Sequence, residues 1–149
     1  MHPTQTPITG REPDTPETTR GALAEFYRAF NSRDLTLIRE NWLRSPEDVL
    51  DNPLGGIRRG WPAIEEVYRR IFSSQTAVEV EFFDYTLHEV GEVFWAVGRE
   101  RGRLSDGSLQ LAIRTTRLFR RHEGRWRQTH HHGSFDDPEM LKAYQERVR

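Results

Sequence analysis

Three consecutive histidines near the end of the chain, His130 to His132, are well placed to do chemistry. Successive side chains of a strand point to opposite faces, so His130 and His132 share one face and His131 lies on the other. The triplet therefore cannot converge on one metal ion. His130 and His132 alone form a partial metal site that needs a third ligand such as Asp51 or Glu79, and we expect no metal. The alternative, which we favour, is that His130 and His132 are polar residues lining a wet pocket.

Two arginines, Arg99 and Arg117, each stand among apolar neighbours in the middle of a predicted strand. A buried guanidinium must find hydrogen-bond acceptors. One interpretation is an ion pair inside the protein with Glu79 or Asp51. The other is a site for a small organic anion, and the residues leave both interpretations open.

Several large aromatic residues, Tyr27, Trp42, Trp95 and Trp126, are expected in the core. One or two such rings commonly form the apolar wall of a ligand pocket. We therefore include Tyr27, Trp95 and Trp126 among the candidate ligand-binding residues.

The composition argues against several classes of function. The net charge is −1, from 22 basic and 23 acidic side chains, so no overall field draws the chain to nucleic acid or to an anionic membrane. The arginine clusters at 99–103 and 117–127 are interrupted by acidic and apolar residues, and we expect no nucleic-acid binding. No apolar run approaches the eighteen or so residues of a membrane span. Without cysteine there is no disulfide or thiolate site, which agrees with the cytoplasmic location that we expect.

The length of 149 residues suits one domain, which buries roughly two-thirds of the surface of the unfolded chain. Residues 1–14 are rich in proline, threonine and glycine, and we expect a flexible N-terminal tail. Residues 15–149 are then a single domain.

Helical periodicity dominates the first half of that domain. Thr15 followed by Pro16 predicts a helix start. Apolar residues then recur at helical spacing: Leu23, Phe26, Tyr27 and Phe30. Asp34 can cap a second, shorter helix, and a third helix opens near Gly60–Pro62. Between the second and third helices, Val49–Asn52 is a predicted short strand.

From Ala77 the apolar period changes to two, which is typical of half-buried strands. Four such segments follow: one from Val78, then Val93–Arg103, Leu109–Arg121 and Arg125–His132. Asp137 and Pro138 begin a last helix. Because helices precede a run of strands, the predicted fold class is α+β.

The last strands also carry a motif. Its parts are Thr116-Arg117-Leu118-Phe119-Arg120-Arg121, a charged hairpin turn, and then Trp126, His130, His132 and Ser134. Together with the order of elements, this resembles the nuclear transport factor 2-like superfamily, whose cone-shaped fold is shared by SnoaL-like polyketide cyclases and ketosteroid isomerases. The motif is most similar to the association domain of calcium/calmodulin-dependent protein kinase II and its free-standing bacterial relatives. The resemblance covers about residues 16–135.

The resemblance implies a cone-shaped, cystatin-like fold. Three helices pack on a curved mixed or antiparallel sheet with a pocket between them, and this chain adds a C-terminal helix. In the related kinase domain, arginines on two strands point into the pocket and hold a carboxylate, and Arg99 and Arg117 match two of them. The chain departs from that pattern twice: Gly133 stands at a third basic position, and Glu79 stands where the pocket histidine falls.

The related isomerases and cyclases use a pocket carboxylate as a proton-transfer base. The resemblance implies that role for Asp51 paired with His130, since a partly buried carboxylate can be tuned toward neutral pH. Alternatively, Asp51 forms a turn before Asn52 and Pro53.

Members of the superfamily commonly pair through the outer face of the sheet. The long strands here carry apolar residues at both parities, such as Phe94 beside Trp95 and Leu118 beside Phe119. A sheet that is buried on both faces needs that pattern. We therefore expect a homodimer through the outer sheet face.

Two kinds of function remain. The first is a non-enzymatic homodimer whose pocket binds a small carboxylate, or which serves as an assembly module. The second is a small isomerase, cyclase or hydratase that uses a pocket Asp or His as general base. The fold hosts both kinds, and we expect no cofactor in either.

Overall fold

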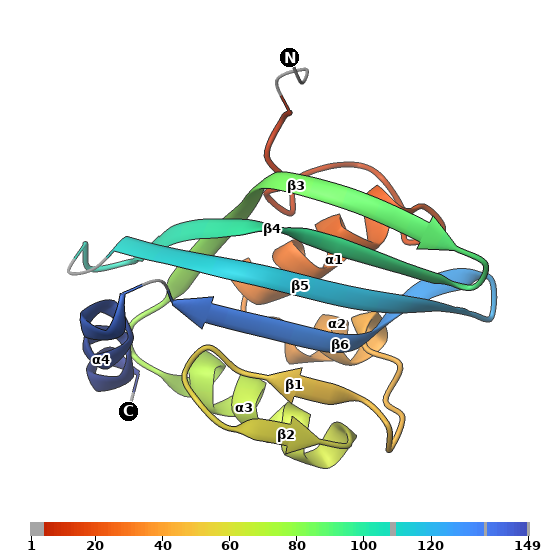
Figure 1. Cartoon of the computed structure of the whole chain (residues 1–149). Coiled ribbons are helices and arrows are strands. Elements are labelled where there is room, and N and C mark those ends of the chain that lie inside the picture. Colours follow the sequence, from red (N-terminus) through yellow and green to blue (C-terminus); the bar gives the residue numbers. More distant parts are fainter. Residues whose placement is uncertain (1–4, 108–109, 136, 149) are drawn as a thin grey trace.

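The structure is a computed structural model that describes residues 5–107, 110–135 and 137–148. The helices are α1 (Thr19–Asn31), α2 (Leu35–Asn41), α3 (Trp61–Ser73) and α4 (Pro138–Arg147). The strands are β1 (Val49–Asp51), β2 (Ile57–Arg59), β3 (Val78–Val90), β4 (Val93–Leu104), β5 (Gln110–His122) and β6 (Arg125–Phe135). Figure 1 shows α1, α2 and α3 on one face of the sheet, with α4 at one end. No helix in the described part of the chain is long and apolar enough to cross a membrane.

The sheet has six strands in the order β2-β1-β6-β5-β4-β3. β1 runs parallel to β6 and the other pairs are antiparallel. The register shifts between Phe83 and Thr86 in β3, and between Gln128 and His130 in β6, opposite Leu118 and Phe119 of β5. Such bulges bend a strand and increase its twist. The predicted α+β fold with a curved mixed sheet is confirmed.

The helix caps explain where the helices begin. The Thr18 side chain accepts a hydrogen bond from the Gly21 amide at 3.0 Å, so α1 begins at Thr19 and not at Thr15–Pro16 as predicted. A Cβ atom on Gly21 would lie 1.7 Å from the Thr15 carbonyl oxygen, which means that only glycine lets the preceding turn pack this closely. Asp34 caps α2 as predicted, accepting from the Leu37 amide at 3.0 Å.

One strand has no counterpart in the sequence prediction, and one predicted strand start lies outside the described residues. β2 was not predicted, because all three of its residues are exposed and no apolar alternation marks it. The start that we predicted for the third long strand, Leu109, lies outside the described residues.

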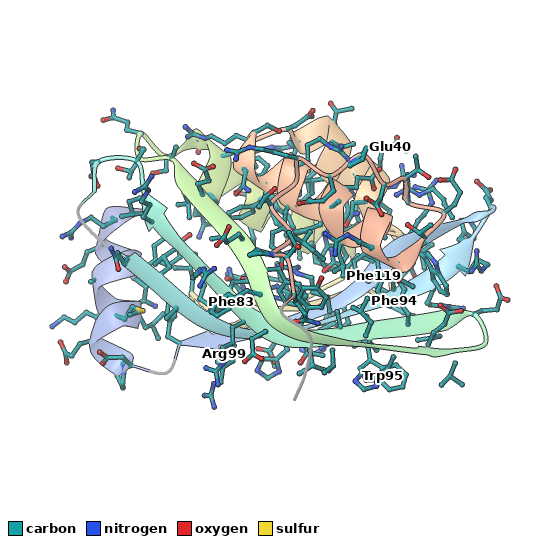
Figure 2. The ribbon with its side chains drawn as sticks, turned by 90° about the horizontal axis from the view of Figure 1, so that it is seen from above. Glu40, Phe83, Phe94, Trp95, Arg99 and Phe119 are labelled. Atoms are coloured by element: carbon teal, nitrogen blue, oxygen red, sulfur yellow. The ribbon has the colours of Figure 1, made fainter. Side chains whose placement is uncertain are left out.

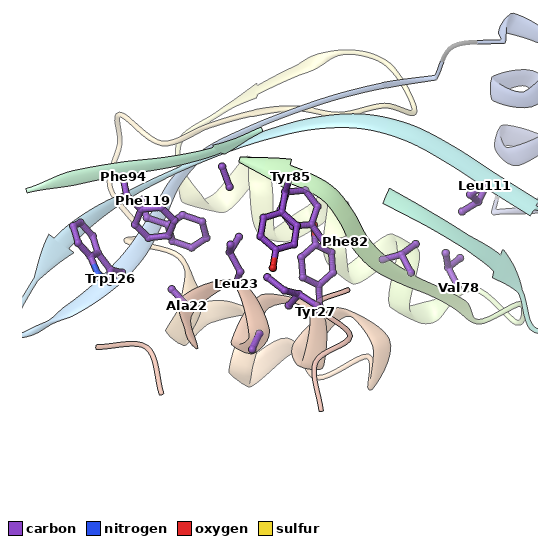
Figure 3. Packing of buried hydrophobic residues seen from close by; sticks show 14 of the residues in the cluster. Ala22, Leu23, Tyr27, Val78, Phe82, Tyr85, Phe94, Leu111, Phe119 and Trp126 are labelled. Atoms are coloured by element: carbon purple, nitrogen blue, oxygen red, sulfur yellow. The ribbon is translucent and has the colours of Figure 1, made fainter. Parts of the chain in front are cut away.

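The core lies between the helices and the inner face of the sheet. Phe94 stacks on Phe119 with ring centroids 4.5 Å apart, and Trp126 meets Phe94 edge-on at 4.9 Å. Tyr27 of α1 stacks on Phe82 of β3 in the same cluster (Figure 3). Figure 2 shows the inner Phe94 and Phe119 pointing toward the helices, while the outer Trp95 and Arg99 point away from them.

The N-terminal segment corrects our expectation of a flexible tail over residues 1–14. Residues 1–4 lie outside the described part, but Ile8 is fully buried in the core cluster of β3 and α1. The Ile8 amide donates to the Phe82 carbonyl and the Phe82 amide to the Ile8 carbonyl, both at 2.9 Å. The Gln5 side-chain amide also bonds the backbone of Tyr85. The segment therefore covers the free edge of β3, which would otherwise present unpaired backbone groups.

Candidate ligand-binding cavity

A cavity of about 50 Å³ lies between the inner face of the sheet and the helices. Most of its wall is apolar, with Phe26 and Phe30 from α1 and Val67 and Ile71 from α3. Six polar or hydroxyl-bearing residues also reach it: Asn52, Tyr68, Glu100, Arg117, His131 and Tyr144. An apolar cavity with a few convergent polar groups is the usual form of a small-molecule site.

Arg117 and Glu100 form a buried ion pair on this wall. The Arg117 Nη2 donates to Glu100 Oε2 at 2.8 Å, and the two side chains are 3% and 5% exposed. The Tyr27 hydroxyl donates to the same Glu100 oxygen at 2.6 Å. The Arg117 guanidinium also lies 3.7 Å from the ring centroid of Phe26. The positive and negative charges on this wall therefore cancel.

A series of hydrogen-bonded side chains extends from Arg117 into the protein. Arg117 Nη1 donates to the Gln128 side-chain oxygen at 2.8 Å, and Gln128 in turn donates to the Asn41 side-chain oxygen at 3.0 Å. Asn41 donates to Glu25, which is paired with Arg125. Because each member has partners, the network fixes the position of the guanidinium.

The tyrosine hydroxyls and the Arg117 guanidinium of the wall keep their ordinary charge states at neutral pH. Burial raises the pKa of Tyr68 to about 12 and also raises the pKa of Tyr27 and Tyr144. Burial opposes the charge on Arg117, but Tyr27 and Glu100 raise its pKa above the ordinary value. The wall thus presents neutral hydroxyls and a permanently charged guanidinium.

The sequence left open whether Arg117 forms an ion pair inside the protein or holds an organic anion. The structure shows an internal ion pair, but its acidic partner is not one of those that we named. Arg117 pairs with Glu100 and not with Glu79 or Asp51. Glu79 points outward, with a side chain 63% exposed and 3.6 Å from Arg11. Glu100 shares the parity of the buried Phe94 and Ala96 on β4, so alternation was a signal for its inward position that we did not use.

The histidines correct our assignment of the pocket face. His131 is buried and lines the cavity, whereas His130 and His132 belong to the opposite face. In β6, Trp126 and Gln128 are buried, and the bulge opposite Leu118 and Phe119 then shifts the parity by one residue. No group of three or more acidic or histidine side chains in the described ranges lies close enough to hold a metal ion.

The structure does not bring Asp51 to His130. The Asp51 carboxylate lies 3.3 Å from His132 Nδ1, in an exposed pair outside the cavity. The His130 ring nitrogen Nδ1 lies 2.9 Å from the Val49 carbonyl oxygen. Neighbouring Leu50 is the β1 residue that faces the cavity.

The remaining candidate residues lie on opposite faces of the sheet. Arg99 is on the outer face, where its Nε donates to Asp84 at 3.1 Å, so it does not join Arg117. Trp95 is also on the outer face and stacks on His88 at 5.1 Å. Trp126 belongs to the core, and Tyr27 reaches the cavity wall through its hydrogen bonds to Glu100 and Arg117.

His131 should make stability depend on pH. Burial, with the positive charge of Arg117, holds the pKa of His131 well below its ordinary value of 6.5, and its Nε2 contacts the Thr115 hydroxyl. As pH falls below that value the unfolded chain takes up a proton that the folded chain does not. The free energy of unfolding should therefore decrease, by up to about 1.4 kcal/mol per pH unit. Urea denaturation between about pH 7.5 and about pH 5 measures this.

The matched variants for that measurement are His131→Gln and His122→Gln, the second at an exposed site. His131→Gln should flatten the pH dependence, and His122→Gln should leave it unchanged. Equal slopes for wild type and His131→Gln would contradict a neutral, buried His131.

The sequence pattern of the SnoaL-like domain matches residues 20–138, so the chain belongs to the SnoaL-like domain family. A comparison with curated proteins gives no match.

Solved structures support the same fold. One from Thiobacillus denitrificans, provisionally named a calcium/calmodulin-dependent protein kinase type II association domain, is 25% identical with a TM-score of 0.70 and covers 85% of this chain and 100% of its own. One from Streptomyces avermitilis, provisionally named a dehydratase of the NTF2-like family, is 18% identical with a TM-score of 0.70, covering 76% and 90%. One from Caulobacter vibrioides with a cystatin-like fold is 19% identical with a TM-score of 0.63, covering 83% and 91%. The predicted superfamily and its association-domain branch are thereby confirmed.

Proposed function

We propose that this chain is a homodimeric binding domain whose internal cavity holds a small organic molecule. The observation that carries the proposal is the convergence of Glu100, Arg117, Tyr68 and His131 on a largely apolar cavity. Polar groups are costly to bury, and they are kept where they orient a ligand or complete a network.

The charge of the wall limits what binds deep in the cavity. Glu100 neutralises Arg117 at 2.8 Å, and the lowered pKa of His131 leaves its ring uncharged. The deep part of the site therefore suits an uncharged group, and an apolar chain or a hydroxyl fits better there than an ionised carboxylate. An anionic group at Arg99 and Arg117, one of the two interpretations that the sequence left open, is therefore not part of this proposal.

An enzymatic role has weaker support. Asp51 pairs with His132 on the outer face, and the His130 ring nitrogen contacts the Val49 carbonyl oxygen and not Asp51. The dehydratase name of the Streptomyces structure belongs to a protein only 18% identical. A binding role is therefore the better account of this cavity.

A fragment screen tests the binding role. Small organic acids and their neutral counterparts are assayed by thermal shift and ligand-observed NMR against the wild type and Val67→Trp. Val67 lines the cavity and is 8% exposed, so the larger ring should fill the space and abolish binding of every hit. Ile57→Trp, at a site 48% exposed, is the control that should keep binding.

Because a bulky residue can strain the core, Ile71→Phe serves as a second filling variant on the next turn of α3. Hits that survive in both folded variants would place the ligand elsewhere. A wild type that binds no fragment would end the binding role.

The outer face of the sheet supports the homodimer. Phe83, Trp95 and Leu118 are half-buried there, and Val97 is 42% exposed. Helices α1, α2 and α3 all lie on the other face (Figures 1 and 2). Trp95 and Leu118 are register partners on neighbouring strands, and exposed apolar side chains of this kind favour an interaction surface. A second copy is its natural occupant, since the Thiobacillus structure of similar fold carries the name of an association domain.

Sedimentation of the purified chain tests the homodimer. The wild type should sediment as a dimer at micromolar concentration, and Val97→Asp should sediment as a monomer because it buries an unpaired charge. Ile57→Asp is the control, and it should remain dimeric. A monomeric wild type, or a dimer unaffected by Val97→Asp and by Trp95→Asp, would overturn this interface.

A further inference from the structure

A second hollow of about 210 Å³ adjoins the cavity. The two share four lining residues: Asn52, Leu54, Val67 and Ile71. The hollow is bounded by the β1–β2 turn, α3 and α4. Its position on the surface and the shared wall make it the natural route into the cavity.

The charge of this hollow differs from that of the cavity. Arg58 of β2 and Arg70 of α3 line it, and none of its described lining residues is acidic. Arg58 is exposed, and Arg70, with a side chain 65% exposed, lies 4.0 Å from Glu66. Two guanidinium groups at the rim therefore form the positive end of a site whose deep end is neutral.

The rim is also held in shape. The Gln145 side-chain amide of α4 donates to the Leu54 carbonyl at 2.7 Å, which ties α4 to the β1–β2 turn. The turn itself is closed by the Gly55 amide, which donates to the Asn52 carbonyl at 2.8 Å, and Gly55 has a φ of +109°. The arginines thus stand on β2 and α3, two regular elements that contact each other, and not on a loose loop.

The volumes limit the ligand. An apolar cavity of roughly 150 Å³ is enough for benzene. The inner cavity here, at about 50 Å³, accepts a short chain but not a ring. The outer hollow has room for an acidic group with its hydration.

We propose that the site binds a short-chain aliphatic monoanion with its charged group at the rim, on Arg58 and Arg70, and its apolar chain in the cavity. This inference rests on the proposed binding role and adds the ligand class, its orientation and the two residues that recognise its charge. Arg117 does not contact the anionic group.

A series of equal chain length tests it: pentanoate, 1-pentanol and pentylamine, with butyl phosphate as a second anion. Titration calorimetry on the full chain should give about tenfold or more tighter binding for pentanoate than for 1-pentanol, because charge-assisted hydrogen bonds add to the same apolar contact. Pentylamine should bind weaker than the alcohol. Tighter binding of butyl phosphate than of pentanoate would assign the rim to a phosphate monoester rather than to a carboxylate, and would overturn the monoanion.

The Arg58→Ala, Arg70→Ala double variant should lower pentanoate affinity to the level of 1-pentanol and leave 1-pentanol unchanged. Arg69→Ala is the control, because Arg69 is an exposed neighbour that pairs with Glu65 outside the hollow. Pentanoate and 1-pentanol binding alike, with no loss in the double variant, would overturn the rim site while the binding role stands. Loss of pentanoate binding in Arg117→Met, without loss in the rim variant, would reverse the orientation. If neither compound binds and the fragment screen is also empty, both proposals fail.

Discussion

Replacing Arg117 by methionine is expected to lower the free energy of unfolding by about 3–5 kcal/mol, because it leaves the Glu100 carboxylate buried without its cation. Glu100 is only 5% exposed, so water cannot take the place of the guanidinium. Gln128 and Tyr27 also lose a hydrogen-bonding partner. Urea denaturation monitored by circular dichroism measures the change.

The partner substitution makes this result specific. In the double variant Arg117→Met, Glu100→Gln the buried charge is gone, and the glutamine can still accept from the Tyr27 hydroxyl. We expect the double variant to recover at least half of the loss, since replacing both members of a buried ion pair is often close to neutral. Arg120→Met, exposed on the same strand, should change stability by no more than about 0.5 kcal/mol. An Arg117→Met variant as stable as Arg120→Met would contradict the buried pair.

Replacing Ile8 by alanine is expected to cost about 2–5 kcal/mol, the usual range for a fully buried isoleucine. Ile8 is 0% exposed and packs in the same cluster as Phe82 and Leu23. The backbone bonds between Ile8 and Phe82 remain in the variant, so the loss reports side-chain packing.

Ile57→Ala is the matched control for Ile8. Ile57 is 48% exposed, and its truncation should cost less than about 0.5 kcal/mol. If Ile8→Ala were as mild as Ile57→Ala, the first residues of the chain would be the flexible tail that composition predicts.

Most elements of the fold could be predicted from the sequence, because their signals are local. The stripe of Leu23, Phe26 and Phe30 has the helical period, and the segments from Val78 onward have the period of strands. Ile8 and β2 carry no such signal. Ile8 is a single apolar residue in a polar stretch, and its burial depends on a pairing with β3 that lies far along the chain.

The site was harder to predict because it depends on which face of each strand is buried. Strand alternation predicts that His131 lies on the opposite face from His130 and His132. The bulge before the three histidines decides which of these faces is turned to the cavity. Glu100 was readable from its parity with Phe94, although its position between two arginines suggested an exposed strand. The two rim arginines stand on separate elements, and no sequence pattern joins them.

The most direct test of the account is a crystal structure of the protein with bound pentanoate. We expect an intact contact between Glu100 and Arg117, an aliphatic chain beside Val67 and Ile71, and a carboxylate at Arg58 and Arg70. An Arg117 side chain turned away from Glu100 to hold the carboxylate, or an empty cavity with the acid elsewhere, would contradict it.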